Sequence, residues 1–323
     1  MRRREFGKAI MISLVPAAVG AADPGPADVT KLRPDDVTAD LYNLCDTYGG
    51  GAVADLAERR LHSIELQLKG ASLPLSAETR VQRIMGALNV CAGSLAFDAG
   101  QQDRAERLCW DALYLAHLAG DTPLRLHVLD QMSYQANVLD RPAWAGHLAE
   151  AALGDARGAD PRLRALLTMR LARAASQRHD ETLVRRNTHA AWRLLDRANL
   201  DAKRPSWFGF FGDQTLTGLE GLCAASTGRH ADAAAAYHRV LGHPATTPLN
   251  KANYSAFRIQ SLVSCGRIDE AVATVHEGLP LLTQVTSGTV AQNLARADGA
   301  LTPYMDVSGV PECRDIMAGL LGR

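Results

Sequence analysis

The densest group of chemically distinctive residues is an aromatic segment at 207–213, Trp-Phe-Gly-Phe-Phe-Gly-Asp. It holds three of the six phenylalanines and one of the four tryptophans in the chain. Ligand sites commonly combine aromatic walls with a few polar groups. We therefore expect Trp207 and Phe211 to form one wall of a pocket, with Asp213 as its polar anchor. The alternative is that these rings fill a groove between two helical repeats.

Common signatures of catalytic and metal sites are missing from the sequence. It contains no Gly-x-x-x-x-Gly-Lys-Ser/Thr loop, no Gly-x-Gly-x-x-Gly turn, no His-Glu-x-x-His pair and no Gly-x-Ser-x-Gly elbow. His147 and Glu150 share a helix face, but no further metal ligand lies near them. We therefore predict no catalytic residue, no metal site and no cofactor.

A short phrase recurs along the chain: a glycine, four residues, then an alanine. It occurs at 100–105, 228–233 and 266–271, and Gly93 and Gly221 each precede one copy by seven residues. In a helical hairpin, the first glycine permits close helix approach, the second allows the turn, and the alanine packs against the first helix. The phrase therefore predicts an all-α, tetratricopeptide-like solenoid of helical hairpins, a right-handed superhelix. Solenoids of this kind usually bind partners.

Capping residues, prolines and glycines give the helix boundaries. Residues 1–34 are expected to be leader and linker, and residues 35–323 to be the repeat domain. We expect five or six degenerate repeats, spaced by roughly 38–49 residues against the ideal 34. Helices are expected at 36–47, 52–69, 77–98, 102–119, 122–139, 142–153, 160–178, 180–199, 214–227, 230–241, 249–265, 268–284, 287–299 and 311–321.

The first helix of each hairpin should line the concave face of the solenoid. We align the five recognisable turns on Gly100, Arg141, His179, Gly228 and Gly266. The aligned groove positions are rich in amides and include an arginine, which suits a peptide backbone or a small polar ligand. The alternative is an ordinary solvated surface. The groove residues that we select as ligand-binding are Gln131, Gln135, Arg173, Gln177, Asn253 and Gln260.

The chain has 35 basic and 35 acidic residues, so its formal net charge is zero. Proteins that bind duplex DNA usually carry a basic surplus, and we therefore expect no direct DNA binding. The charge is uneven, because residues 161–204 hold eleven Arg or Lys and four Asp or Glu, 11 − 4 = +7. This run is either a solvated arginine face or a stripe for an acidic partner.

The cysteines and the amino terminus point to different compartments. No two of the six cysteines lie within ten residues of each other, which favours a reducing compartment without a disulfide framework. Residues 3–8, Arg-Arg-Glu-Phe-Gly-Lys, resemble a twin-arginine export motif, followed by an apolar stretch at 9–20 and small residues at 21–22. That stretch is short and contains Pro16, so we expect no membrane span. We expect a cytoplasmic protein, with an exported one as the alternative.

Three stretches resemble a known family. They are Leu95-Ala-Phe-Asp-Ala-Gly100 with the continuation to Asp121, the segment 128–136, and Cys265-Gly-Arg-Ile-Asp-Glu-Ala271. Over about residues 36–310 the chain resembles the tetratricopeptide-like carboxy-terminal region of actinobacterial XRE-type transcriptional regulators. The resemblance implies a region that senses a ligand or partner. The family's helix-turn-helix has no counterpart before residue 36, so DNA binding is not implied.

The sequence therefore predicts a regulatory binding module that is not an enzyme. We expect it to recognise a peptide, a protein or a small-molecule effector through its concave face, and to act in transcriptional regulation through a partner. An exported helical binding protein and an enzyme on a helical scaffold are the alternatives.

Overall fold

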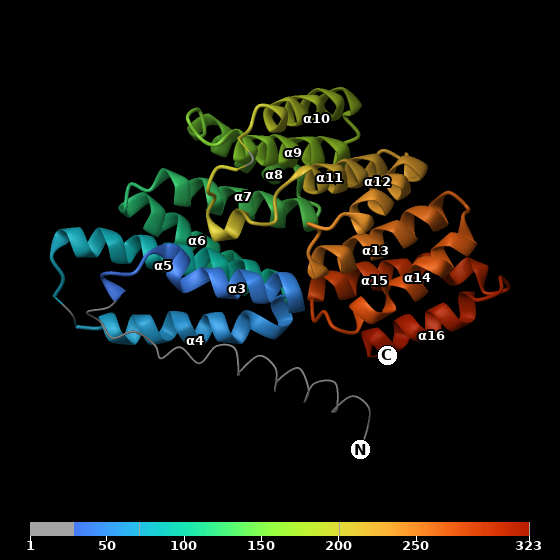
Figure 1. Ribbon diagram of the computed structural model, residues 1–323, viewed down its shortest axis with the longest axis horizontal. Helices are drawn as coiled ribbons and strands as arrows, with labels where there is room; N and C mark the ends of the chain where they lie inside the picture. Colours follow the sequence, from blue (N-terminus) through green and yellow to red (C-terminus); the bar gives the residue numbers. More distant parts are fainter. Residues whose placement is uncertain (1–28, 71, 200, 323) are drawn as a thin grey trace, which may run out of the picture.

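The computed structural model describes residues 29–70, 72–199 and 201–322, and every regular element in that part of the chain is helical (Figure 1). This confirms the predicted all-α class. The α-helices are α3 (Pro34–Tyr48), α4 (Gly50–Leu68), α5 (Leu75–Asp98), α6 (Gln102–Leu118), α7 (Thr122–Val138), α8 (Pro142–Asp155), α9 (Pro161–Gln177), α10 (Glu181–Asp196), α11 (Asp213–Ser226), α12 (His230–Gly242), α13 (Pro248–Ser264), α14 (Ile268–Leu282), α15 (Gly288–Leu301) and α16 (Val310–Leu321). Short 3₁₀ turns are η2 (Ser206–Phe208) and η3 (Thr302–Tyr304).

Each odd-numbered helix packs against the even-numbered helix that follows it, from α3 with α4 to α15 with α16. Consecutive odd-numbered helices also contact one another, so they form an inner layer and the even-numbered helices an outer one. The described residues therefore contain seven hairpins (Figure 1). The expectation of five or six repeats was too low, because only three of the seven hairpins carry the glycine–alanine phrase.

The recurring phrase has the predicted structural role. Gly100, Gly228 and Gly266 have φ of 83°, 79° and 75°, a left-handed conformation that glycine adopts without strain. The alanine that ends each phrase is completely buried. A Cβ on Gly221 would lie 2.6 Å from the ring of Tyr237, so only glycine permits this helix approach. In these three hairpins, small buried residues therefore let the two helices pack closely.

Two other turns reach the same left-handed conformation without glycine. Asp140 has φ of 55° and His179 has φ of 56°. Aspartate and histidine are among the non-glycine residues that tolerate this region best. The turn position aligned on His179 is thus correct, but the one aligned on Arg141 is wrong by one residue, because Asp140 makes that turn.

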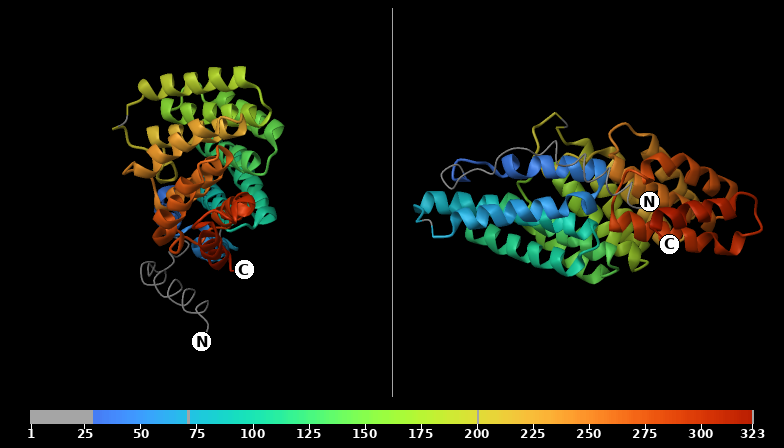
Figure 2. Two further views of the ribbon diagram at one scale, coloured as in Figure 1. Left: turned by 90° about the vertical axis from the view of Figure 1, so that its right-hand side faces the viewer. Right: turned by 90° about the horizontal axis from the view of Figure 1, so that it is seen from below.

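The solenoid closes on itself. Helix α3 packs against α13, and α5 contacts α15, so the first two hairpins meet the last two (Figures 1 and 2). The Thr286 N–H donates to the Tyr48 carbonyl at 2.7 Å, and the Gly51 N–H donates back to the Thr286 carbonyl at 2.9 Å. A Cβ on Gly51 would lie 2.8 Å from that carbonyl oxygen, so the two backbones meet only because this position is glycine. We call this junction the seam.

One buried carboxylate organises the seam. Asp98, in the last turn of α5, accepts hydrogen bonds from the Gly50 N–H at 2.6 Å, from the Ser287 hydroxyl at 2.7 Å and from the Thr289 hydroxyl at 2.5 Å. Burial raises the pKa of Asp98, and these three donors oppose that shift. The side chain thus joins α4 and α15 to α5 across 191 positions of sequence.

The expected leader falls mainly outside the described residues. Residues 1–28, with the twin-arginine-like motif, are among those not described, so the boundary at 34/35 stays a prediction. Within the expected linker, Val29 is fully buried and the Thr30 carbonyl accepts from Arg80 at 3.0 Å. None of the helices in the described ranges is long and apolar enough to cross a membrane.

Removal of the Asp98 carboxylate should open the seam. We expect Asp98→Ala to destabilise the protein by about 2–5 kcal/mol, because three buried donors lose their acceptor. The free energy of unfolding measures this by chemical denaturation. Asp111→Ala, on an exposed part of α6, is the matched control and should change stability by less than about 0.5 kcal/mol. Equal effects of the two variants would show that the seam does not stabilise the fold.

Candidate ligand-binding chamber

The inner helices of the closed solenoid surround a partly open chamber of about 660 Å³. Every helix of the inner layer contributes to its wall: α3, α5, α7, α9, α11, α13 and α15. The segment between α10 and α11 adds Trp207 and Phe210. Ligand pockets commonly have volumes of about 300–1,000 Å³, so the chamber is large enough for a small ligand or a short peptide. We call this space the central chamber.

The structure brings five of the nine sequence-predicted ligand residues together in this wall. They are Gln131, Arg173, Gln177, Trp207 and Asn253. Four come from first helices of three different hairpins, and the fifth comes from the aromatic segment. The concave-face alignment and the aromatic segment therefore lead to the same space.

The other four predicted residues lie elsewhere. Phe211 is buried and stacks on Phe208 with ring centroids 4.9 Å apart. Asp213 is largely exposed, with its carboxylate 3.7 Å from His243. Gln135 borders a small groove with residues of α6 and α8, and its amide lies 3.5 Å from the Cys109 sulfur. Gln260 donates to the backbone carbonyl of Asn293 at 2.9 Å.

The one-residue error at Asp140 explains the position of Gln135. When the same five groove positions are counted back from the true turn at Asp140, they all line the chamber; they are His127, Asp130, Tyr134, Asn137 and Val138. Sequence reasoning therefore selected Gln135 in place of Tyr134, and it missed Asn137. The signal that could have found Asn137 was the tolerance of aspartate for a left-handed turn.

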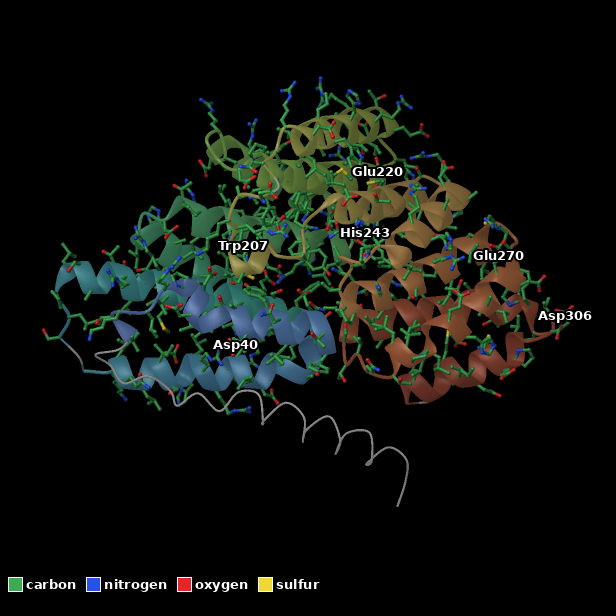
Figure 3. The ribbon with its side chains drawn as sticks, in the orientation of Figure 1. Asp40, Trp207, Glu220, His243, Glu270 and Asp306 are labelled. Atoms are coloured by element: carbon green, nitrogen blue, oxygen red, sulfur yellow. The ribbon has the colours of Figure 1, made fainter. Side chains whose placement is uncertain are left out.

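The aromatic segment both packs and lines the chamber. Trp207 stacks on His127 with ring centroids 3.8 Å apart and an interplanar angle of 9°. Figure 3 shows Trp207 in the middle of the molecule, beside α3 and α7. Phe208 and Phe211 fill the core beneath it. Ser206 donates its hydroxyl to Asp35 at 2.8 Å, which ties the segment to the start of α3. Trp207 thus lines a pocket wall, as the first sequence-based interpretation expects, whereas Phe211 fills space between helices, as the second expects.

His127 is buried as a neutral imidazole. Burial lowers its pKa to about 3. Its Nε2 lies 3.4 Å from the hydroxyl of Tyr42 on α3, and its ring faces Trp207. A histidine with so low a pKa is a poor general acid at neutral pH, so its role here is packing and hydrogen bonding.

Two amides on the α7–α9 side of the chamber present oxygens without partners. The Asn137 amide nitrogen donates to the carbonyl oxygens of Ser133 and Arg170, and the Gln177 amide nitrogen donates to the Asn137 carbonyl at 2.8 Å. Since these partners only accept, both amide orientations are fixed. The Asn137 Oδ1 and Gln177 Oε1 atoms are buried and accept no hydrogen bond from the described residues. The wall residues Asn137 and Gln177 thus each carry one acceptor without a partner among the described residues.

A second pair of amides lies on the α13–α15 side. Asn293 donates its amide to the Oδ1 atom of Asn253 at 3.0 Å, and both residues line the chamber. Asn253 donates in turn to the Leu249 carbonyl at 3.3 Å. The chamber thus has amide groups on its α7–α9 side and on its α13–α15 side. The segment between α10 and α11 adds the aromatic rings of Trp207 and Phe210 to the wall.

The basic run at 161–204 has two different environments. Arg162 and Arg170 are buried, and they pair with Asp160 and Asp130 respectively. Arg173 faces the chamber. The arginines of α10 are exposed, and one of them, Arg185, pairs with Glu181. Part of the excess of basic residues at 161–204 is therefore buried inside the protein, and does not form a basic surface.

Asp46, in the last turn of α3, is the exception among the carboxylates of the chamber. It has neither a hydrogen bond nor an ion pair with any described residue, and it borders the cavity. Burial raises its pKa from 3.8 to about 6. The folded protein thus holds an ionised, uncompensated carboxylate at neutral pH.

The described part of the chain offers little for nucleophilic or metal chemistry. Burial raises the pKa of both Cys91 and Cys109 to about 12, which leaves these thiols protonated at neutral pH. Across residues 29–70, 72–199 and 201–322, no three His, Cys, Asp or Glu side chains are grouped as metal ligands.

Comparison with known proteins supports the fold. No family model matches the chain, and no curated protein matches its sequence. Among solved structures, it is similar to a Rap protein complexed with Competence and Sporulation Factor, with a TM-score of 0.52 and 11% sequence identity. The match covers 89% of this chain and 97% of that one. The likeness spans nearly the whole array and confirms a tetratricopeptide-like helical repeat fold.

The unpaired Asp46 gives the protein a characteristic pH dependence. Its pKa is higher in the folded state than in the unfolded state, so ionisation above pH 6 opposes folding by roughly 1–3 kcal/mol. We expect Asp46→Asn to raise the melting temperature at pH 8. The gain should shrink as the pH falls through 6 and vanish below about 4, where the wild-type carboxyl is protonated in both states.

Thermal unfolding between pH 4 and 8 measures this effect. Asp111→Asn, at an exposed position of α6, is the matched control and should show no such trend. A stabilisation by Asp46→Asn that does not change with pH would contradict an uncompensated carboxylate in the chamber.

Proposed function

We propose that this chain is a regulatory binding module that captures a short, extended peptide in the central chamber. The observation that carries the proposal is the pair of buried, unpartnered oxygens of Asn137 and Gln177. An unsatisfied buried acceptor costs about 1–3 kcal/mol, which a ligand N–H group would recover. A peptide backbone supplies such groups at regular intervals.

The shape and chemistry of the wall support a peptide. Backbone carbonyls of a peptide need donors, and Arg173 and the Gln131 amide nitrogen supply them. Trp207, Phe210 and Phe257 supply apolar surface for side chains. A cavity of about 660 Å³ also has room for a short extended peptide but not for a folded domain.

The similar fold of the Rap protein gives further support. That protein was solved in complex with Competence and Sporulation Factor. We infer that this chain likewise binds a signalling factor, and that binding alters its contacts with a partner protein. The sequence resemblance to XRE-type regulators suggests that the regulated process is transcription, controlled through that partner.

The module acts by binding, without catalysis and without direct contact with DNA. The alternative of an exported binding protein concerns residues 1–28, outside the described residues. The mature amino terminus in the native host separates the two: an intact Met1 supports the cytoplasmic module, and a start near Ala22 supports export.

Peptide binding should depend on the unpartnered amides. We expect a library of linear hexapeptides, screened by thermal shift and then by calorimetry, to yield ligands of the wild-type chain. Gln177→Met keeps the side-chain length but loses the acceptor, and it should weaken these ligands roughly tenfold to hundredfold. Gln292→Met, on an exposed part of α15, is the matched control.

The melting temperature of both variants must be measured without ligand, because Gln177 also donates to Asn137. If Gln177→Met remains folded and binds every selected peptide as tightly as the wild type, the amides do not contact the ligand. If no hexapeptide binds the wild type at millimolar concentration, the peptide proposal fails.

The purified chain should not bind duplex DNA specifically. Its net charge is zero, and part of its basic run is buried or paired. We expect no sequence-specific binding at about 0.15 M salt, and no steep salt dependence, because few phosphate contacts are available. Electrophoretic mobility shift with genomic fragments tests this, and nanomolar binding to one fragment would overturn it.

A further inference from the structure

Three buried charged side chains of the chamber wall already have partners within the protein. The Arg170 guanidinium donates to the Asp130 carboxylate at 2.9 Å, and both side chains are buried. The Asp98 carboxylate is held by the seam donors. These groups are satisfied before any ligand enters, so they do not define what the chamber selects.

Arg173 is a different case, because its partners are neutral. Its Nη1 atom donates to the hydroxyls of Ser176 and Ser226 and to the Leu222 carbonyl. No carboxylate of the described residues lies within ion-pair distance of it. The remaining edge of the guanidinium, Nε and Nη2, makes no hydrogen bond within the described part of the chain, although the side chain borders the chamber. A mostly buried cation is costly without an anionic partner.

Asp46 is the complementary case. Its carboxylate borders the same chamber and has no partner among the described residues. It comes from α3, which packs on α4, α5 and α13, whereas Arg173 comes from α9, which packs on α7, α8, α10 and α11. The two uncompensated charges therefore belong to different sides of the ring.

Other charged residues of the wall lie at its exposed rim. Asp140, His179 and Arg296 border the chamber but are exposed to solvent. Water and salt screen such charges, so they contribute little selectivity. Arg173 and Asp46 remain as the charges whose burial a ligand could compensate.

We propose that the chamber selects a peptide that carries both a negative and a positive group, with its carboxylate bound by Arg173 and its cationic group bound by Asp46. This inference rests on the proposed peptide-binding function and specifies its ligand. The free Nε–Nη2 edge of an arginine matches the two oxygens of a carboxylate. The amide acceptors of Asn137 and Gln177 lie on the α7–α9 side of the chamber with Arg173, so they would receive N–H groups near the anionic end.

The carboxylate can be a C-terminus or an acidic side chain, and the cation an amino terminus or a basic side chain. The experiment separates these sources. Each peptide selected from the hexapeptide library is resynthesised with an amidated C-terminus, with Asp and Glu replaced by Asn and Gln, with an acetylated amino terminus, and with Lys and Arg replaced by norleucine and citrulline. Calorimetry gives the affinity of every form for the wild type.

We expect one anionic and one cationic modification each to weaken wild-type binding by about tenfold or more, as for charge-assisted hydrogen bonds in a buried site. For Arg173→Gln, removal of the ligand carboxylate should then change the affinity less than about threefold, while removal of the cation keeps its full effect. Asp46→Asn should show the reverse pattern. Arg296→Gln, at the exposed rim, is the control and should keep both effects.

These double-mutant comparisons remain informative if a variant is less stable, because a general loss of affinity cancels within each pair. If peptides bind but neither charge modification matters to the wild type, the charge inference is wrong and peptide binding stands. If both modifications matter equally to Arg173→Gln and to the wild type, Arg173 is not the anion site. If no peptide binds, both proposals fall.

Discussion

The hydrogen bonds of the Asp98 carboxylate are the constraint on which the rest of this structure depends. They fasten α4 and α15 to the end of α5, at the junction where the first hairpins meet the last. Without that junction, seven hairpins would form an open arc with a shallow concave face. With it, the inner helices surround a chamber, and polar groups on each of them are brought close to one another.

The chamber contains groups that do not favour folding. Asp46 is ionised without a partner, Arg173 is largely buried among neutral groups, and Asn137 and Gln177 hold unsatisfied acceptors. In contrast, the crossings between the helices are closely packed, with alanines fully buried at the hairpin turns. Such a distribution is typical of proteins whose packing supports a site that is less than optimal for stability.

The sequence contained enough to predict the fold, because the Gly100, Gly228 and Gly266 phrases encode both the turn and the helix crossing. It also contained much of the site, since Arg173, Gln177 and Asn253 occupy concave positions that follow from those turns. Asn137 was missed because its turn uses Asp140, and an aspartate in a left-handed turn leaves a weak signal. Closure could not be predicted, since the partners of Asp98 lie 189 and 191 positions away and no local pattern links them.

Closure of the solenoid also restricts how this protein could have changed in evolution. An open repeat array can gain or lose a hairpin by duplication or deletion, because each unit contacts only its neighbours. Here an added hairpin would move Thr289 away from Asp98, and a deleted one would bring the two ends into collision. The number of repeats is therefore fixed by the geometry of the ring. New binding specificity can arise without breaking the seam through substitutions in the inner helices or in the segment between α10 and α11.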